Sequence, residues 1–222
     1  NRHGVEVVTP KKIRCCGSLN HHLGKEDDAH KDFKNNIITW YEEHKKGNLD
    51  AILSNTSGCG TTIKDYGFIF RDDKELSKKA KIISNLTKDI TEYLFDSLKL
   101  NISHKEKNYR IAYHSACSMQ HGQKVHLQPI SLLKKTNNEI LEIPEGHICC
   151  GSAGTYNILQ SKIAKQLLDK KVKNIESLKP DFISTGNIGC ITQISHGTKV
   201  PILHTIEVLD WYTGGPKPLI LK

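Results

Sequence analysis

CCGSAGTYNILQ, residues 149–160, places Cys149 and Cys150 side by side and follows them with Gly151. Adjacent Cα atoms across a trans peptide lie about 3.8 Å apart, which is awkward for a disulfide between the two side chains. The same two thiols are well placed to reach two iron atoms of one cluster. Iron–sulfur chemistry is therefore the first hypothesis that this stretch suggests.

Two further cysteines in the second half of the chain complete a set of four thiols on three separate turns. Four thiolates are what a [4Fe–4S] cluster needs. Gly151 and Gly189 leave room for backbone amides to approach the cluster sulfurs. Structural zinc and plain buried thiols are the alternatives, and zinc is disfavoured because its four-cysteine sites usually use C-x₂₋₄-C pairs. The predicted cluster ligands are Cys117, Cys149, Cys150 and Cys190.

Strands and helices alternate along the sequence. Short apolar or β-branched runs predict strands, and longer segments with apolar residues at the helical period predict helices. This alternation favours an α/β fold with parallel sheets. Strands are predicted at 4–9, around 51–53, and at 109–114, 138–145, 181–186 and 200–204; helices are predicted at 25–46, 73–98 and 152–178, around 132–133, after 190 and around 208–211.

The two halves of the chain repeat one plan. The first contains CCGSLNHH and later SGCG, and the second contains CCGSAGTY and later NIGC. We therefore predict two Rossmann-like repeats related by a pseudo-twofold, residues 1–105 and 106–222, with the polar stretch 101–108 as linker. In each repeat the cysteines should lie at the carboxyl ends of strands, where open α/β sheets bind their ligands.

The first repeat contains only three cysteines, Cys15, Cys16 and Cys59. By the logic of the repeat, a fourth ligand would lie about thirty residues before Cys15, which is ahead of residue 1. We expect the chain to be truncated at its amino end and to keep a three-ligand remnant of a second cluster site. The alternative is that the first repeat is degenerate, holds no cluster and is kept only for its role in the fold.

Charge and cysteine usage restrict the class of protein. The formal charge of +8 comes almost entirely from lysine, and scarce arginine argues against nucleic-acid binding. No apolar run approaches the roughly 20 residues that span a bilayer, and the amino end has no secretory signal. Seven cysteines without such a signal indicate metal or redox chemistry in the cytoplasm rather than a disulfide framework.

Several segments resemble the cysteine-rich CCG domains of heterodisulfide reductases and of iron–sulfur subunits of flavin-dependent hydroxyacid oxidoreductases. Within that family they are most similar to the iron–sulfur subunits of glycolate oxidases. The resemblance covers nearly the whole chain. It rests on CCGSLNHHLG, NTSGCGTTIKDYG, YHSACSMQHGQ, CCGSAGTYNILQ, GNIGCITQI and HTIEVLDW.

The resemblance implies an electron-transfer subunit whose partners are flavoprotein subunits carrying FAD. Those partners would oxidise glycolate to glyoxylate, and the electrons would continue to a quinone or another respiratory acceptor. A cytoplasmic location, peripheral on the inner face of the membrane through the complex, is also implied. A lactate-oxidation or heterodisulfide-reductase-type subunit is the alternative within the family, and a zinc-stabilised interaction module is the alternative outside it.

The sequence departs from the family pattern in two places. The family carries a ferredoxin-like segment ahead of the CCG region, whereas no C-x₂-C-x₂-C run is present here. The heterodisulfide reductase pattern also ends each repeat in CxxC, and here Thr56 and Asn187 stand at the first position of that motif. Four thiols per site, rather than five, favour an ordinary cubane cluster and electron relay over disulfide reduction.

Histidines accompany the cysteines in sequence. Either they tune a cluster and assist proton-coupled transfer, or they only form structural hydrogen bonds, and the structural interpretation is the more common one. The histidines in question are His21, His22, His114, His121 and His204.

Overall fold

The computed structural model describes residues 2–47, 49–102 and 107–221. They form two compact units, one within residues 1–54 and 58–89 and the other within 55–57 and 90–222. The three-residue segment 55–57 therefore groups with the second unit although it lies in the first half of the sequence. The predicted boundary between residues 105 and 106, and the middle of the predicted linker, lie outside the described residues.

The first unit packs helices around one short parallel pair of strands. β1 pairs with β2, with Ile52 opposite Thr87. Buried aromatic and aliphatic side chains, among them Phe33, Tyr66 and Ile83, form its core. Its elements are α1 (Ser18–His22), α2 (Glu26–Lys45), β1 (Ile52–Ser54), α3 (Ser57–Ile69, which begins in the second unit), α4 (Ser77–Leu86) and β2 (Thr87–Asp89).

Two predictions for the first unit are wrong, whereas the helix predicted at 25–46 is confirmed by α2. Residues 5–10 have no regular structure, and Val7 and Val8 are 64% and 56% exposed. A β-branched run forms a strand only where a neighbouring strand and a core receive it. The helix predicted at 73–98 is interrupted because residues 87–89 turn extended and pair with β1.

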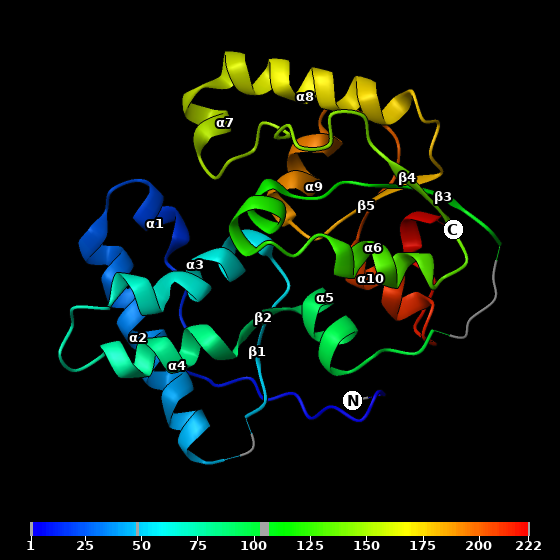
Figure 1. Ribbon diagram of the computed structural model, residues 1–222. Helices are drawn as coiled ribbons and strands as arrows, with labels where there is room; N and C mark the ends of the chain where they lie inside the picture. The colour runs from blue at the N-terminus through cyan, green and yellow to red at the C-terminus, as the bar shows by residue number, and fades with distance from the viewer. Residues whose placement is uncertain (1, 48, 103–106, 222) are drawn as a thin grey trace. The chain divides into compact units, whose positions relative to one another are not determined.

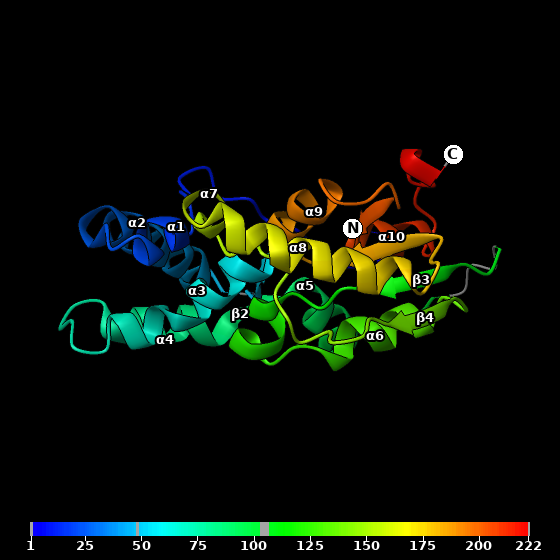
Figure 2. The same ribbon diagram turned by 90° about the horizontal axis from the view of Figure 1, so that it is seen from above.

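The second unit is built on a four-stranded parallel sheet in the order β4-β3-β5-β6. Figure 1 shows the elements of the unit, and Figure 2 shows α8 along its full length in the foreground. The elements are α5 (Ile90–Glu92), η1 (Tyr93–Ser97), β3 (Arg110–Tyr113), η2 (Ser118–Gln123), α6 (Leu127–Lys134), β4 (Glu139–Glu142), α7 (Tyr156–Leu159), α8 (Ser161–Glu176), β5 (Phe182–Thr185), α9 (Ile188–Ser195), β6 (Ile202–His204), α10 (Thr205–Trp211) and η3 (Leu219–Leu221).

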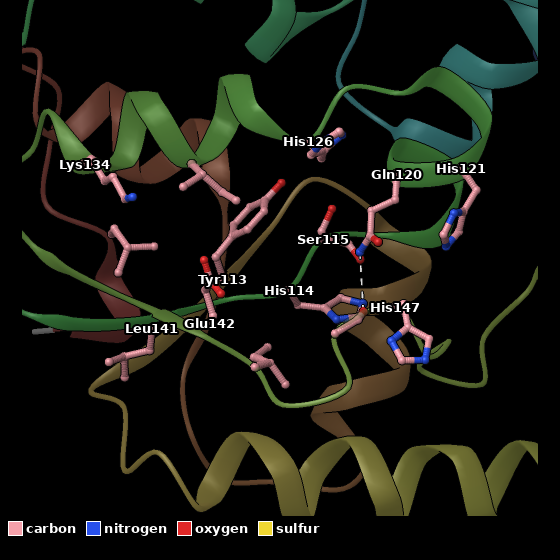
Figure 3. A pocket seen from close by; sticks show the side chains of 14 residues that line it. Tyr113, His114, Ser115, Gln120, His121, His126, Lys134, Leu141, Glu142 and His147 are labelled. Atoms are coloured by element: carbon pink, nitrogen blue, oxygen red, sulfur yellow. Dashed lines mark hydrogen bonds between the residues drawn. The ribbon is translucent and has the colours of Figure 1, made fainter.

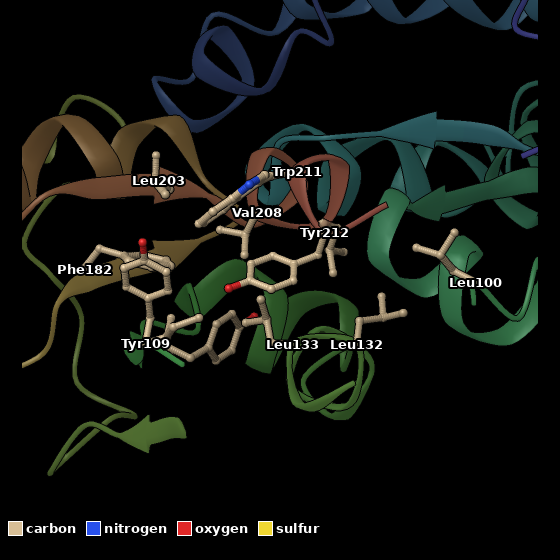
Figure 4. Packing of buried hydrophobic residues seen from close by; sticks show 12 residues of the cluster. Leu100, Tyr109, Leu132, Leu133, Phe182, Leu203, Val208, Trp211 and Tyr212 are labelled. Atoms are coloured by element: carbon tan, nitrogen blue, oxygen red, sulfur yellow. The ribbon is translucent and has the colours of Figure 1, made fainter. Parts of the chain in front are cut away.

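Alternate residues of the central strands enter two separate cores, as the period of two along a strand requires. Phe182 of β5 packs with side chains from α6 and α10, whereas its neighbour Ile183 packs with side chains from α8 and α9. Figure 4 shows the first of these cores, in which Trp211 and Tyr212 lie among aliphatic side chains. Because both faces of the sheet are covered, the central strand β5 is buried at all four positions, whereas the edge strand β4 keeps exposed glutamates at both ends.

The strands predicted in the second half of the sequence are confirmed by β3, β4, β5 and β6. The single helix predicted at 152–178 is instead two helices, α7 and α8, separated at Gln160, whose φ and ψ of −124° and 49° leave the helical region. The chain is therefore an α/β protein with two parallel sheets. The pseudo-twofold relation between the repeats stays a prediction.

Candidate metal centre

The four cysteines of the second unit follow the carboxyl ends of three neighbouring parallel strands. Cys117 comes four residues after the end of β3, Cys149 and Cys150 follow β4 through a loop, and Cys190 lies in the first turn of α9 after β5. Carboxyl ends of parallel strands meet at one edge of a sheet, which is why residues 73 positions apart can come together. The sequence predicted this convergence, and the structure has it.

The thiols lie close enough to influence one another. Cys150 Sγ lies 3.4 Å from Cys190 Sγ. Cys117 and Cys150 both act on the pKa of Cys149. Cys150 is 1% exposed and Cys190 is also buried, whereas Cys117 and Cys149 are partly accessible. The cluster of thiols thus has a buried end and an end open to solvent.

Hydrogen bonding divides the four thiols into proton donors and thiolate acceptors. The thiol of Cys117, and after it the neighbouring Cys150 and the amide of Gly151, stabilise the Cys149 thiolate and hold its pKa far below the usual range. The thiol of Cys150 likewise lowers the pKa of Cys190 to about 6. The pKa values of the donors Cys117 and Cys150 are raised, first by these same bonds and then by burial. Two of the four sulfurs are therefore predisposed to be thiolates, the form that binds metal.

His114 joins the thiols at the buried end. One of its ring nitrogens and the sulfurs of Cys150 and Cys190 all lie within 4.8 Å of one another. The side chain is 2% exposed, and neither ring nitrogen makes a hydrogen bond of good geometry within the described residues, although His114 lies close enough to Cys190 to help lower the pKa of that thiol. A buried polar group without a partner is costly and calls for a ligand or a functional explanation. The sequence offered His114 only as one histidine among several, since position at the end of a strand does not reveal which way the ring points.

Gly151 allows the turn that presents the two adjacent cysteines. Its φ is +93°, and a Cβ there would lie 2.4 Å from the carbonyl oxygen of Ala164 in α8. Its amide donates to Cys149 Sγ at 3.3 Å. The glycine is thus required by the backbone conformation and by the close approach of α8, and the amide's contact with a candidate ligand sulfur follows from that placement.

Asn187, predicted to mark a missing fifth thiol, has a structural task at the start of α9. Its Oδ1 accepts hydrogen bonds from the amides of Gly189 at 2.8 Å and Cys190 at 3.2 Å. Its Nδ2 donates to Ser57 Oγ at 2.8 Å, so it also fixes the segment 55–57. An asparagine at this position satisfies amides that the helix leaves unpaired. Asn187 therefore positions the Cys190 thiol instead of adding another.

Lys171 of α8 brings a buried positive charge to the thiols. It is 1% exposed and donates to the carbonyl oxygens of Glu145 at 3.3 Å and Gly146 at 3.4 Å, in the loop that leads to Cys149. Burial lowers the pKa of Lys171, and the neighbouring Cys150 opposes that shift. The sequence did not indicate this residue, because a lysine within a lysine-rich helix looks like a solvated one.

The first unit brings two of its three cysteines together. Cys16 Sγ lies 3.0 Å from Cys59 Sγ, whereas Cys15 is exposed. That contact raises the pKa of Cys16 and lowers that of Cys59. Gly17 follows the cysteine pair with a φ of +76°, as Gly151 does in the second unit. Across residues 2–47, 49–102 and 107–221, the trio that contains His114 is the only group of three such ligand residues this close together.

The remaining histidines divide between structural and accessible positions. His204 caps α10: its Nδ1 accepts from the amide of Ile206 at 3.1 Å, and its Nε2 lies 2.7 Å from the carbonyl oxygen of Asn55. His21 Nδ1 lies 3.2 Å from a carboxylate oxygen of Glu26. His204 and His21 thus have structural partners, and His21, His22 and His121 line surface pockets.

The donor set suits a soft metal centre. Thiolates with imidazole favour zinc, copper(I) and iron–sulfur clusters, and four converging thiols provide the number of ligands that a [4Fe–4S] cluster requires. The residues present therefore fit the cluster that the sequence predicted. No helix in the described part of the chain is long and apolar enough to cross a membrane.

Comparisons with known proteins find cysteine-rich and iron–sulfur relatives. A family model for the cysteine-rich domain named CCG matches residues 1–64 and 111–195. The chain is 34% identical over 212 residues to the glycolate oxidase iron-sulfur subunit of Escherichia coli, covering 95% of this chain and 51% of that protein. It is 29% identical over 215 residues to lactate utilization protein A of a Geobacillus strain, covering 94% and 88%. It thus spans about half of the first relative and most of the second.

Proposed function

Because the chain belongs to the family of CCG cysteine-rich domains, we propose that it is an iron–sulfur electron-transfer subunit of a flavin-dependent complex that oxidises 2-hydroxy acids. The observation that carries the proposal is the convergence of four thiols and the buried His114 at one edge of a parallel sheet. The names of the related proteins, a glycolate oxidase subunit and a lactate utilization protein, support the same class of complex.

The ligands we propose for the iron of the cluster are Cys117, Cys149, Cys150 and Cys190. When bound, a [4Fe–4S] cluster supplies one-electron transfer. The two buried thiols and the sheet edge exclude water from one side, while the two partly exposed thiols leave the other side accessible to a redox partner. Lys171 and the amide of Gly151 place positive charge and a hydrogen-bond donor beside the sulfurs, which favours the thiolate form.

In the complex, the substrate chemistry belongs to flavoprotein partners that carry FAD. These oxidise glycolate to glyoxylate, and the electrons leave through this chain to a quinone or another respiratory acceptor. The chain has no catalytic residue of its own in this proposal. It resides in the cytoplasm, peripheral on the inner face of the membrane through its partners.

Lactate is the second candidate substrate, since lactate utilization protein A aligns over 88% of its length. Reconstitution of the complex decides between them: the acid that reduces the partner flavin under anaerobic conditions is the substrate. A heterodisulfide-reductase-type subunit would instead pass electrons from the flavin to a disulfide.

We also propose a second, incomplete site in the first unit, held by Cys15, Cys16 and Cys59. The contact between Cys16 and Cys59 supports it, and the exposure of Cys15 weakens it. This site would need a further ligand from outside the three cysteines. It is secondary to the site in the second unit.

Anaerobic analysis of iron and sulfide, with EPR after dithionite reduction, tests the proposal. Iron and sulfide in equal amounts with a reduced-cluster signal are expected, and zinc without iron or sulfide would refute electron transfer. Cys150→Ser should bleach the visible absorption because it removes a buried ligand. Cys59→Ser is the matched control: it leaves the absorption unchanged unless the first unit also holds a cluster, in which case part of the iron is lost.

A further inference from the structure

Exposed apolar side chains lie on two elements next to the turn that carries the paired cysteines. Ile158 and Leu159 of α7 and Ile188 of α9 are 76%, 66% and 60% exposed. Single exposed aliphatic residues are ordinary, but several on neighbouring elements mark a surface that another molecule covers. We call these three residues the apolar patch.

Hydrogen bonds and close packing fix the patch beside the candidate metal centre. The amide of Asn157 donates to the carbonyl oxygen of Ser152 at 3.3 Å, and the side-chain Nδ2 of the same residue donates to Gln193 Oε1 of α9 at 3.0 Å. A Cβ at Gly189 would lie 2.8 Å from Ser152 Oγ, so the start of α9 contacts the segment that follows Cys150. The patch therefore belongs to the elements that present the thiols.

Three segments around the thiols contain no acidic residue. They comprise residues 114–126, 146–165 and 186–195, whereas the whole chain has 24 aspartates and glutamates among 222 residues. The segments follow β3, β4 and β5, so they begin at the edge of the sheet where the cysteines converge. We call them the acid-free segments, and they include all three residues of the apolar patch.

The charged side chains of the acid-free segments are basic. Lys124 and Lys162 are exposed, one in each of the first two segments. Figure 3 shows His121 and His147, which come from the same two segments and line one cavity at this edge. Glu142 of β4 also lines that cavity, and it lies outside the segments. The edge is therefore positive apart from carboxylates at its margin.

Other carboxylates at the margin are already paired with lysines. Glu145, immediately before the second segment, lies 2.6 Å from Lys170 Nζ. Asp169 lies 2.7 Å from Nζ of Lys165, which is the last residue of that segment. These pairs contribute little net charge, so the net charge near the patch comes from basic groups.

A bound cluster alone does not explain both features of this surface. Four thiolates around iron bring negative charge, which disfavours further carboxylates nearby. The same charge gives no reason for isoleucine and leucine side chains to stay in water. A protein partner explains both features, because interfaces combine an apolar centre with a polar rim and complementary charge.

We propose that the apolar patch and the basic groups around it are the docking surface for the flavoprotein subunit, whose own face is acidic around an apolar centre. The inference rests on the proposed function, in which the electron donor is a protein and the acceptor is a small molecule. Cys117 and Cys149, the partly accessible thiols, lie at the same edge. A partner on this surface is close to the metal centre, and electron transfer slows steeply with distance.

A second copy of the chain and a membrane fit the surface less well. Two copies of this face would bring lysine against lysine, which opposes association. Anionic lipids would attract the lysines, but a helix that lies on a membrane presents an apolar face over several turns, whereas α7 has four residues. The acidic protein partner is therefore favoured.

Carbodiimide cross-linking of the intact complex tests the surface directly, because the reagent joins lysines to carboxylates in contact with them. Cross-links are expected from Lys124 or Lys162 to aspartates or glutamates of the flavoprotein subunit. The control lysines Lys107, Lys179 and Lys199 are exposed and each lies three residues before a strand, at the opposite edge of the sheet. Cross-links to the flavoprotein from the controls alone would overturn the proposal. Cross-links from Lys124 and Lys162 only to a second copy would also overturn it.

Ile158→Glu supplies the second test, because it places a carboxylate within the apolar patch. It should raise the Kd between the metal-loaded chain and the flavoprotein subunit about tenfold or more at low salt, since it removes an apolar contact and repels an acidic partner. Ile158→Lys loses the same contact but adds an attractive charge, so it should raise the Kd less. A larger effect of Ile158→Lys than of Ile158→Glu would refute the acidic partner.

Leu219→Glu is the matched control for the loss of an exposed aliphatic residue. Leu219 is exposed near the carboxyl end, which Figures 1 and 2 place far from α7 within the second unit. This variant should keep the parent Kd. If Ile158→Glu, with full iron content, binds the flavoprotein as tightly as Leu219→Glu does, the docking surface lies elsewhere.

Sedimentation with vesicles of phosphatidylcholine and phosphatidylserine distinguishes a protein partner from a membrane. Ile158→Glu should sediment with the vesicles to the same extent as the parent chain. If the substitution abolishes binding to vesicles but leaves the Kd for the flavoprotein unchanged, the patch faces a membrane and the proposal is wrong.

This proposal and the proposed function fail in different ways. If hydroxy acid does not bleach the iron–sulfur absorption of the parent complex, the proposed function is wrong, and cross-linking still locates the docking surface. If hydroxy acid bleaches the absorption but the cross-links come from the control lysines, only the docking surface is wrong.

Discussion

Gly151→Ala tests whether the turn after the paired cysteines determines the site. Two separate costs follow from the structure: the φ of +93° is unfavourable for an alanine, and the added Cβ would lie 2.4 Å from the carbonyl oxygen of Ala164. Ordinary contact begins at 3.4 Å, so the loop or α8 must move by about 1 Å. Because Gly151 follows the cysteine pair directly, the movement also displaces Cys149 and Cys150.

The two costs can be estimated. Holding a non-glycine residue at such a φ costs about 1–3 kcal/mol, and an extra methyl group in a packed site costs about 1–3 kcal/mol more. Lower entropy of the unfolded chain offsets about 0.4–1 kcal/mol of that sum. The free energy of unfolding of the second unit should therefore fall by about 2–5 kcal/mol.

Gly214→Ala separates the two costs. Gly214 lies in the same unit with a φ of +99°, and nothing lies within 4 Å of the Cβ that an alanine would add. It should show only the backbone cost and the offset from the unfolded chain. The difference between the two variants, about 1–3 kcal/mol, then measures the collision with α8.

Urea unfolding of the reduced, metal-free chain is the assay. In a Trp40→Phe background Trp211, which is buried in the second unit, is the only tryptophan and reports that unit alone. If Gly151→Ala destabilises no more than Gly214→Ala, within about 0.5 kcal/mol, the argument from close approach is refuted. Iron content after reconstitution should fall in Gly151→Ala and stay at the parent value in Gly214→Ala.

Three further predictions concern the thiols and the groups around them. Asn187→Ala should lower the free energy of unfolding in urea by about 1–2 kcal/mol, because it removes the cap of α9. Asn187→Asp keeps the acceptor oxygen and should lower it less. Equal losses in the two variants would show that the cap is unimportant. Lys171→Met should lower the midpoint potential of the loaded chain in an EPR-monitored titration, because it removes a buried positive charge that interacts with Cys150, Cys149 and Cys190. Lys170→Met, whose side chain is 49% exposed, is its control, and equal shifts would contradict a specific role. In the metal-free chain at about pH 7, iodoacetamide should modify Cys149 about tenfold faster than Cys117, since the pKa of Cys149 is lowered and that of Cys117 raised; the reverse order would contradict the hydrogen-bond directions.

Much of the second unit could be predicted from the sequence because its signals are local. Each strand is a short apolar run that ends beside a polar or glycine-rich turn, and each cysteine follows such a run. Parallel pairing then brings the turns to one edge of the sheet without any knowledge of side-chain contacts. The convergence of Cys117, Cys149 and Cys190 depends only on this topology.

The errors in the first unit have a non-local cause. The apolar period of α4 continues through Leu86 and Ile90, so periodicity alone extends the helix across residues 87–89. Those residues become a strand because they pair with β1, which lies more than thirty residues earlier in the chain. Thr87 ends the helix with an extended ψ of 126°, and its Oγ1 donates to the carbonyl oxygen of Ile83 at 2.8 Å. Pairing with a distant strand overrides local propensity here.

The side chains that surround the thiols were harder to predict than the thiols. His114 and Lys171 are buried only because of how β3 and α8 pack, and neither residue stands in a pattern that marks it. Asn187 was visible as a departure from CxxC, but its meaning came from three-dimensional contacts. The sequence indicated what the position lacks, and the hydrogen bonds to α9 and to Ser57 indicate what it does.

That substitution also bears on the chemistry of the site. A cysteine at position 187 would add a further thiol but would lose the N-cap of α9, because a thiol is only a weak acceptor for the amides of Gly189 and Cys190. Asparagine satisfies both amides and anchors Ser57, so the start of α9 is rigid and Cys190 has a fixed direction. A rigid set of four thiols suits a centre that changes only its charge during turnover, since electron transfer gains from ligands that do not rearrange. Disulfide chemistry would instead need a thiol that is free to move, and position 187 no longer supplies one.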